Sequence, residues 1–315
     1  DAGGKGMSKK EVLTLTEESK TILGKCIHPT LKNSVRTGLV IGNIQSGKTL
    51  SFSAISCLAK DNNIKIIIII SGTKTNLFDQ TKKRILNDII GRDQDWTART
   101  SKEMGADSSY DLKKLLNYEG SALLISCLKN KSQITKITEF INNSDFNFST
   151  LIIDDESDQA GLNTQASKNN NKESSTYKSI LNLRRAFKSH TYLKYTATPE
   201  ADLLIKRDDE LSPDFVELIS PGSKYTGIKE FFNSTITSKI IKEIPPKPDP
   251  YDEKIMPDTL KEAVLVYLIG LCDGEIKRNK KEKLDNSNRT MYVHPDRIKN
   301  VHTSYETFIK RYLEI

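Results

Sequence analysis

Apolar and polar residues follow one another along the chain in blocks. Continuous apolar runs, the clearest being five isoleucines in a row at residues 66–70, are typical of strands that are buried on both faces. Such runs predict strands at residues 37–43, 63–73, 120–129, 148–157 and 191–199. The segments between them predict helices at residues 49–60, 76–89, 130–143 and 177–189. This alternation predicts an α/β fold with a mainly parallel sheet flanked by helices.

Several segments lie outside the alternation. Residues 8–35 are predicted to be helical with a break at His28 and Pro29, residues 167–178 to form a surface loop, and residues 1–6 to be a remnant foreign to the fold. The Pro-rich stretch 243–258 is typical of a linker, and it is followed by a predicted apolar helix and the start of a strand within 289–302. The expected organisation is an N-terminal segment (1–35), an α/β lobe (36–242), the linker (243–258) and a smaller, helical C-terminal part (259–315).

Charge and cysteine usage narrow the class of protein. The 315 residues carry a net charge of +7, which attracts polyanions such as nucleic acid, although a lysine-rich solvated surface would give the same balance. No apolar run reaches the roughly 20 residues of a membrane-spanning helix. The cysteines form no close pair and the histidines have no cysteine at metal spacing. A soluble, reduced, cytoplasmic protein without membrane contact or zinc site is therefore expected.

The stretch VIGNIQSGKTLSF at residues 40–52 carries the phosphate-loop pattern Gly42-x-x-x-x-Gly47-Lys48-Thr49. It follows a predicted strand and opens a predicted helix, as the mechanism requires. In such a loop the backbone N–H groups hold the phosphates, Lys48 reaches the β- and γ-phosphates, and Thr49 ligates magnesium. The sequence therefore predicts ATP and Mg²⁺ as ligands.

Acidic residues follow another buried strand in LIIDDESDQAG. The carboxyl ends of strands in open α/β sheets face the ligand crevice. There Asp155 is predicted to hold the magnesium ion and Glu156 to orient or deprotonate the attacking water, with Asp158 two residues further on. The alternative is an exposed acidic loop without a catalytic role.

A third segment, YTATPEADLLI, closes another apolar strand with Thr196 and Thr198. After a phosphate loop and an Asp-Glu-x-Asp run, it matches the third motif of superfamily-two helicases and translocases, which links the ATP site to the nucleic-acid site. Together, GNIQSGKT, IDDESDQAGLNT and YTATPEADLLI resemble the Z-one domain family, bacterial helicase-like ATPases of restriction or anti-phage gene clusters. The resemblance spans about residues 36–305 and implies a RecA-like ATPase lobe.

The resemblance also implies roles for single residues. The phosphate-loop positions are Gly42, Gln45, Ser46, Gly47, Lys48 and Thr49. The catalytic positions are Lys48, Asp155 and Glu156, and the coupling motif is Thr196, Ala197 and Thr198. The segments 71–76 and 127–130 stand where such enzymes touch a nucleic-acid backbone, which makes Lys74, Lys129 and Asn130 candidates for that contact. Ordinary solvated loop residues are the alternative for these three.

Superfamily-two enzymes close two RecA-like lobes around ATP, and the second lobe supplies an arginine finger worth about 10³–10⁵ in rate in NTPases that use one. The start of such a lobe is expected near residue 290, with too little chain behind it to complete one. The chain is therefore expected to be an N-terminal fragment that binds nucleotide and hydrolyses it poorly.

The functional expectation is the ATPase lobe of a nucleic-acid motor, acting on DNA rather than RNA, with partner proteins of a defence system that include a nuclease. The main alternative is a phosphate-loop ATPase that switches a protein partner. A nuclease pattern also occurs in Pro257, Asp258, Glu275 and Lys277. The helix predicted between the two carboxylates would hold them about 25 Å apart, which argues against that chemistry.

Overall fold

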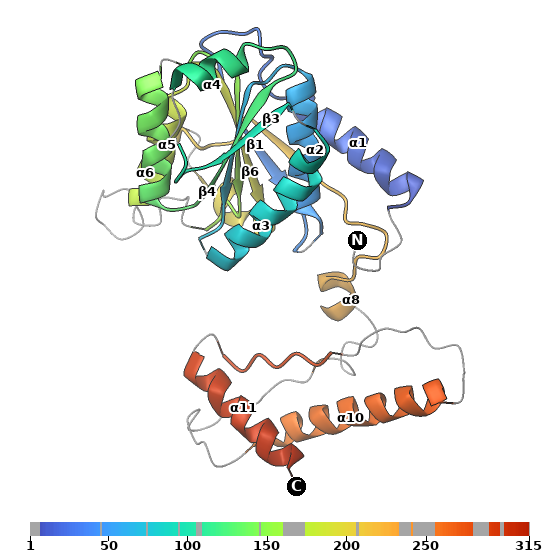
Figure 1. Cartoon of the computed structure of the whole chain (residues 1–315). Helices are drawn as coiled ribbons and strands as arrows, with labels where there is room; N and C mark the ends of the chain where they lie inside the picture. The colour runs from blue at the N-terminus through green and yellow to red at the C-terminus, as the bar shows by residue number, and fades with distance from the viewer. Residues whose placement is uncertain are drawn as a thin grey trace. The chain divides into compact units, whose positions relative to one another are not determined.

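The structure, a computed structural model, describes residues 7–44, 46–73, 75–93, 95–104, 109–144, 146–159, 174–205, 208–232, 241, 256–279, 290–296 and 299–314. The chain forms two compact units, Asp1–Tyr225 and Thr226–Ile315 (Figure 1). Most of the predicted loop 167–178 and of the predicted linker 243–258 lies outside the described residues. No helix in these ranges has the length and hydrophobicity needed to cross a bilayer.

The first unit is built on a seven-stranded sheet in the order β3-β4-β2-β5-β6-β1-β7. Its strands are β1 (Val35–Ile41), β2 (Ile66–Ser71), β3 (Trp96–Thr100), β4 (Ala122–Leu128), β5 (Thr150–Asp155), β6 (His190–Thr196) and β7 (Phe215–Leu218). Every neighbouring pair runs parallel. The predicted α/β fold with a parallel sheet is therefore confirmed, and all seven carboxyl ends lie at one edge of the sheet.

Helices cover both faces of this sheet (Figure 1). The helices of the unit are α1 (Lys9–Gly24), α2 (Lys48–Asp61), α3 (Thr75–Asp88), α4 (Ser109–Leu116), α5 (Lys131–Ser144), α6 (Ser175–Arg185) and α7 (Glu200–Leu203), with a 3₁₀ turn at Ile90–Arg92. Side chains of α1, α2 and α3 share one apolar cluster with the sheet, and those of α4, α5 and α6 share the other. The parallel sheet is thus enclosed between two helical layers, as its continuous apolar strands require.

The isoleucine run of β2 shows how the sheet is enclosed. Ile66, Ile68 and Ile70 belong to the cluster under α4, α5 and α6, whereas Ile67 and Ile69 belong to the cluster under α1, α2 and α3. All five side chains are fully buried. Successive side chains of a strand point to opposite faces, so a strand covered on both sides needs apolar residues at every position.

The N-terminal helix is shorter than predicted. It ends at Gly24, and the chain then leaves the helix so that the Ile27 amide donates to Thr191 Oγ1 at 2.9 Å. The break therefore comes before His28 and Pro29, because a tertiary hydrogen bond takes the backbone out of the helix first.

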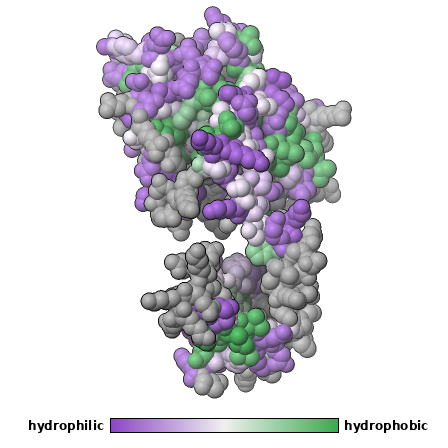
Figure 2. Space-filling model, turned by 90° about the vertical axis from the view of Figure 1, so that its right-hand side faces the viewer, coloured by the Kyte–Doolittle hydropathy of each residue, from purple (hydrophilic) through white to green (hydrophobic). Residues whose placement is uncertain are grey.

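The second unit contains α8 (Ile228–Phe232), α10 (Asp258–Asn279) and α11 (Lys299–Leu313). Its core joins Leu260 and Val264 of α10 to Tyr305 and Phe308 of α11. Other apolar side chains of α10 remain exposed, and Figure 2 shows apolar surface gathered on this unit. The C-terminal part is helical as expected.

The strand predicted within 289–302 is not formed in the described residues of that segment. Residues 290–296 carry no strand assignment, and α11 begins at Lys299. Alternating apolar residues in this stretch, such as Met291 and Val293, pack on the helical core instead. The helix α10 also separates Asp258 from Glu275 as expected, so the nuclease pattern is not assembled within it.

Candidate nucleotide site

The phosphate-loop segment connects β1 to α2 at the carboxyl edge of the sheet. Gly42 directly follows β1, and its amide donates to the Thr196 carbonyl at 3.0 Å. A Cβ at Gly42 would lie 2.7 Å from Ile219 Cγ1, so packing requires glycine there. Gly47 has φ 100° and immediately precedes α2, which begins at Lys48. Glycine adopts this left-handed conformation without strain, so packing explains the glycine at position 42 and backbone geometry explains the one at position 47.

Lys48 stands in the first turn of α2, and its ammonium donates to the Asn43 carbonyl at 3.2 Å. Partial burial lowers the pKa of Lys48, and the carboxylates of Asp155, Glu156 and Asp158 at the end of β5 oppose this shift. These carboxylates therefore act electrostatically on the lysine, although they belong to a segment more than 100 residues away in the sequence.

Other groups of the loop are arranged for an oxygen-rich ligand. The Ser46 hydroxyl is buried and has no hydrogen-bond partner in the described part of the chain. Thr49 lies half-buried in the first turn of α2. The Tyr225 hydroxyl donates to the Ile44 carbonyl at 2.8 Å and so anchors the tip of the loop. The amino end of a helix favours anions, which fits a phosphate group here. Gln45 lies outside the described residues.

Asp155 is the last residue of β5, and one strand, β6, separates β5 from β1. The register pairs Asp155 with Tyr195 of β6, and Ile41 of β1 pairs with Thr196. The acid and the phosphate loop therefore leave the sheet at the same level. Burial, followed by the charge of Glu156, raises the pKa of Asp155 to about 6. A buried carboxylate with raised pKa at this edge suits a cation as partner.

Glu156 has φ 54°, the left-handed region that residues other than glycine, asparagine and aspartate seldom adopt. Its Oε2 atom is buried and has no hydrogen-bond partner among the described residues. The same atom would lie 2.6 Å from a Cβ at Gly72, the residue after β2, so the carboxylate occupies a notch that the missing side chain of Gly72 leaves, and it would have to move if Gly72 carried a Cβ. Strained backbone and an orphaned acidic oxygen are features that cluster at functional sites.

Asp158 joins the acidic segment to the end of β6. Its carboxylate accepts from Thr196 Oγ1 at 2.9 Å and from Thr198 Oγ1 at 2.8 Å. The Thr198 amide in turn donates to Thr196 Oγ1 at 2.9 Å. The two threonines predicted as a coupling motif are therefore bonded to the segment that carries Asp155 and Glu156.

A buried ion pair that the sequence did not reveal supports this edge. Lys194 of β6 pairs with Asp202 of α7 at 2.6 Å, and both side chains are almost completely buried. Asp202 also accepts from Ser157 Oγ at 2.7 Å. A lysine at the centre of an apolar strand was the only sequence signal, since such a residue needs a buried partner.

The three predicted nucleic-acid contacts do not share one environment. Lys74 lies outside the described residues. Asn130 precedes α5, and its Oδ1 accepts from the Gln133 amide at 2.9 Å, which is the geometry of a helix cap. Lys129 is 2% exposed and forms an ion pair with Asp154 at 2.7 Å. Its ammonium has no surface to offer a polynucleotide, so we correct the expected contact and assign Lys129 to the interior.

The residues present fit a magnesium ion held together with phosphates. No group of three or more His, Cys, Asp and Glu side chains in the described ranges forms a metal cage. Magnesium is commonly bound through one or two protein oxygens, with waters and substrate phosphates completing its shell. Thr49 in the first turn of α2 and Asp155 at the end of β5 offer such a limited donor set.

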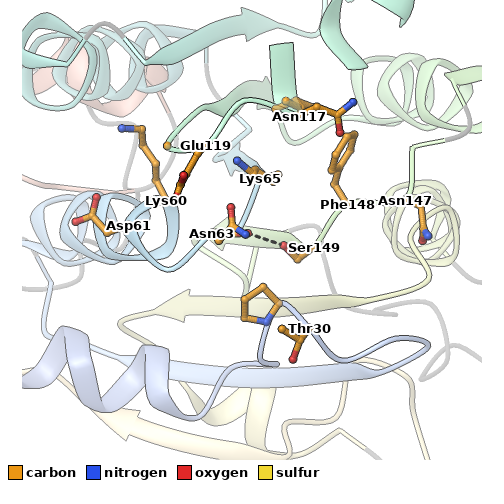
Figure 3. A pocket seen from close by; sticks show the side chains of 13 residues that line it. Thr30, Lys60, Asp61, Asn63, Lys65, Asn117, Glu119, Asn147, Phe148 and Ser149 are labelled. Carbon is orange, nitrogen blue, oxygen red and sulfur yellow. Dashed lines mark hydrogen bonds between the residues drawn. The ribbon is translucent and has the colours of Figure 1, made fainter. Parts of the chain in front are cut away.

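A hollow of about 740 Å³ lies at the opposite, amino edge of the strands (Figure 3). Its cations are already paired with protein groups. Lys65 Nζ donates to the carbonyls of Tyr118 and Ser121, and Lys60 pairs with Asp93. The carboxyl edge, with its orphaned polar oxygens, is therefore the stronger candidate for a ligand site.

No protein-family model matches the chain, and no curated protein does. Among solved structures, the chain is similar to the Pyrococcus furiosus Hef helicase domain, at 15% identity and a TM-score of 0.41 over 98% of this chain and 55% of that one. It is also similar to the ATP-dependent Type ISP restriction-modification enzyme LlaBIII bound to DNA, at 17% identity and a TM-score of 0.42, over 76% and 16% of the respective chains. The chain thus spans about half or less of the length of these structures. Likeness at this level does not say what the chain binds or does.

Proposed function

We propose that this chain binds ATP with Mg²⁺ at the carboxyl edge of its sheet and is the ATPase lobe of a superfamily-two helicase-like or translocase-like motor. One observation carries the proposal. The phosphate loop, the acidic segment at the end of β5 and the two threonines at the end of β6 meet at that edge. The Gly42 amide donates to the Thr196 carbonyl and the Thr196 hydroxyl donates to Asp158, which connects all three.

Each residue has a stated role in this proposal. The amides of residues 42–48 and the Lys48 ammonium bind the phosphates, with Ser46 as a further donor. Thr49 and Asp155 hold the magnesium ion, which when bound neutralises charge on the phosphates. Glu156 uses its unpaired oxygen to orient or deprotonate a water molecule. Gly47 and Gly42 let the backbone approach the ligand.

The nucleic-acid part of the proposal rests on the coupling motif and on charge. Thr196 and Thr198 are bonded to Asp158, so a displacement after β6 reaches the acidic segment directly. The net charge of +7 favours a polyanionic partner, for which DNA is preferred to RNA. Membership of the Z-one domain family, a role in anti-phage or restriction-type defence, and partner proteins that include a nuclease are part of this proposal.

The first test is nucleotide binding by the chain, followed with a fluorescent ATP analogue. Lys48→Ala is expected to weaken binding at least about tenfold, because it removes a charge-assisted phosphate contact. Glu156→Gln, a nearly isosteric control in the same site, should retain binding and lose turnover. Unchanged affinity in Lys48→Ala would sink the proposal.

The effect of polynucleotides on ATP turnover distinguishes a nucleic-acid motor from a switch. ATP turnover by the chain is measured with single-stranded DNA, double-stranded DNA and RNA. Stimulation by any of them supports the motor. Basal turnover that none of them changes favours a phosphate-loop ATPase that switches a protein partner.

A further inference from the structure

Lys129 reaches across the sheet from β4 to the acidic segment. It directly follows β4, and its amide donates to the Ser71 carbonyl at the end of β2, the next strand. Its side chain then extends over this strand end toward β5, the second neighbour of β4. No part of its side chain is exposed. An ammonium placed there must find acceptors in the interior.

The ammonium donates to two backbone carbonyls, that of Asp155 at 2.9 Å and that of Glu156 at 2.6 Å. It also forms an ion pair with Asp154 Oδ1 at 2.7 Å, which balances its charge. The other Asp154 oxygen accepts from the Tyr192 hydroxyl, which fixes the carboxylate on the face opposite to Asp155. Lys129 therefore clamps two successive peptide groups of the proposed catalytic segment.

The clamped residue is also the strained one. Glu156 is held at φ 54°, and such a conformation persists only where the surroundings impose it. Its amide donates to Asp155 Oδ1 at 3.1 Å, and the next amide, of Ser157, donates to the Tyr195 carbonyl at 3.0 Å. The Glu156 carbonyl also accepts from the Lys129 ammonium. Hydrogen bonds therefore fix the peptide units on both sides of Glu156. Its side chain is thereby directed into the notch at Gly72.

We infer that Lys129 is a positioning residue for Glu156. Its ammonium, neutralised by Asp154, imposes the left-handed backbone that leaves the Glu156 carboxylate with an unpaired oxygen at the carboxyl edge of the sheet. The inference rests on the proposed function for the role of Glu156, whereas the clamp itself is a property of the folded chain.

Amide hydrogen exchange of residues 156–159 in the whole chain tests the clamp without any turnover. The paired variant Lys129→Met with Asp154→Asn removes both charges, so that neither is left buried and unpaired. The matched control Tyr192→Phe removes the hydrogen bond from the Tyr192 hydroxyl to Asp154 and leaves the ammonium on both carbonyls. Exchange is expected to accelerate at least about tenfold in the paired variant and less than about twofold in the control.

Unchanged exchange in the paired variant overturns the inference, and so does equal acceleration in the control, because a general loss of packing would move both. Single-turnover ATP cleavage should fall in the paired variant at least about tenfold while nucleotide affinity stays within about threefold. Adding the pair to Glu156→Gln should slow cleavage no further, since one positioned group is already lost. Additive losses would contradict the assignment.

Gly72→Ala tests the same geometry if the paired variant does not fold. Its Cβ would meet Glu156 Oε2 at 2.6 Å and displace the carboxylate, while the P-loop is untouched. Because the clamp holds the backbone and not the carboxylate, exchange at residues 156–159 should stay within about twofold of the wild type, while single-turnover cleavage falls and nucleotide binding is retained. Accelerated exchange would mean that the Glu156 side chain, and not Lys129, holds this backbone, and it counts against the clamp. A wild-type chain that binds no nucleotide refutes the proposed function alone, because the exchange comparison needs no nucleotide.

Discussion

Thr196 donates its hydroxyl hydrogen to Asp158 at 2.9 Å, across the gap between the ends of β6 and β5. The backbone carbonyl of Thr196 at the same time accepts from the Gly42 amide of the phosphate loop. A single residue thus contacts the loop through its main chain and the acidic segment through its side chain. A motion of the segment after β6 must change one of these contacts or both.

Asp158→Ala is predicted to uncouple nucleotide turnover from polynucleotide binding. The substitution removes the acceptor of both threonine hydroxyls, but it leaves Lys48 and the loop amides in place. Nucleotide affinity should change little, and stimulation of the ATPase by the activating polynucleotide should fall at least about fivefold. Titrations with nucleotide measure the affinity, and titrations with polynucleotide at saturating ATP measure the stimulation of the ATPase.

The matched control for this prediction is Thr198→Ser, which keeps the hydroxyl donor to Asp158 and should keep the stimulation. Full stimulation in Asp158→Ala would show that the hydrogen bonds after β6 carry no coupling.

Two glycines at contrasting positions give the second prediction. In Gly42→Ala the new Cβ would lie 2.7 Å from Ile219 Cγ1, whereas a Cβ at Gly24 meets nothing within 4 Å. Gly42→Ala should lower the free energy of unfolding by about 1–3 kcal/mol and weaken nucleotide binding, because the loop must shift. Gly24→Ala, at the end of α1, should raise stability by about 0.4–1 kcal/mol. Urea unfolding measures the free energy of unfolding of both variants. Equal changes in the two variants would contradict the tight packing at Gly42.

The strands that the sequence predicted are those buried on both faces. β2 and β4, for example, are buried at every position and carry a single serine each among apolar residues, so their apolar runs mark them clearly. β3 and β7 lie at the two edges of the sheet and were not predicted. Both are short. β3 is buried only at its two end positions, and β7 alternates half-buried with exposed positions. Their strand conformation depends on the neighbouring strand, which a local pattern does not show.

The candidate site also contains residues that the sequence predicted and residues that it did not. The phosphate loop and the acids after β5 were predicted because their chemistry depends on local spacing. The buried ion pair of Lys129 and Asp154 was not predicted, because only the strand order brings the two residues together. A sequence shows which residues are charged, but it does not show which of them pair. Strand alternation alone could have shown that Asp154 and Asp155 face opposite sides of the sheet.

The surroundings of His190, the first residue of β6, predict how the free energy of unfolding depends on pH. Its Nε2 accepts from Arg184 Nε at 3.2 Å, and its Nδ1 lies 3.3 Å from the Phe187 carbonyl. Burial first and the Arg184 charge second lower the pKa of His190 to about 4, although the Phe187 carbonyl acts in the opposite direction. A second proton on this ring would have to displace the hydrogen bond from Arg184.

Between pH of about 6.5 and about 4 the unfolded chain binds a proton at this histidine and the folded chain does not, so stability falls as the pH falls. At the low end of that window the loss of stability from this group reaches about 3 kcal/mol, because the pKa of His190 lies at about 4 in the folded chain instead of about 6.5. His190→Gln retains a donor and an acceptor, and it should flatten this part of the profile. Urea unfolding at several pH values measures it, with the exposed His28→Gln as control. A wild-type slope retained in His190→Gln would refute the assignment.

The buried pair of Lys194 and Asp202 gives the last prediction, on the stability of the carboxyl edge. The two charges are 2.6 Å apart, and Asp202 also accepts from Ser157 Oγ. Lys194→Met alone leaves the carboxylate buried without its cation and should cost about 3–5 kcal/mol. Adding Asp202→Asn removes the stranded charge and retains an acceptor for Ser157, so the double variant should be more stable than Lys194→Met. A double-mutant cycle by urea unfolding should give a coupling energy of about 0.5–3 kcal/mol. Additive losses would mean that solvent or another group already compensates Asp202, and that the pair does not hold the end of β6 against α7.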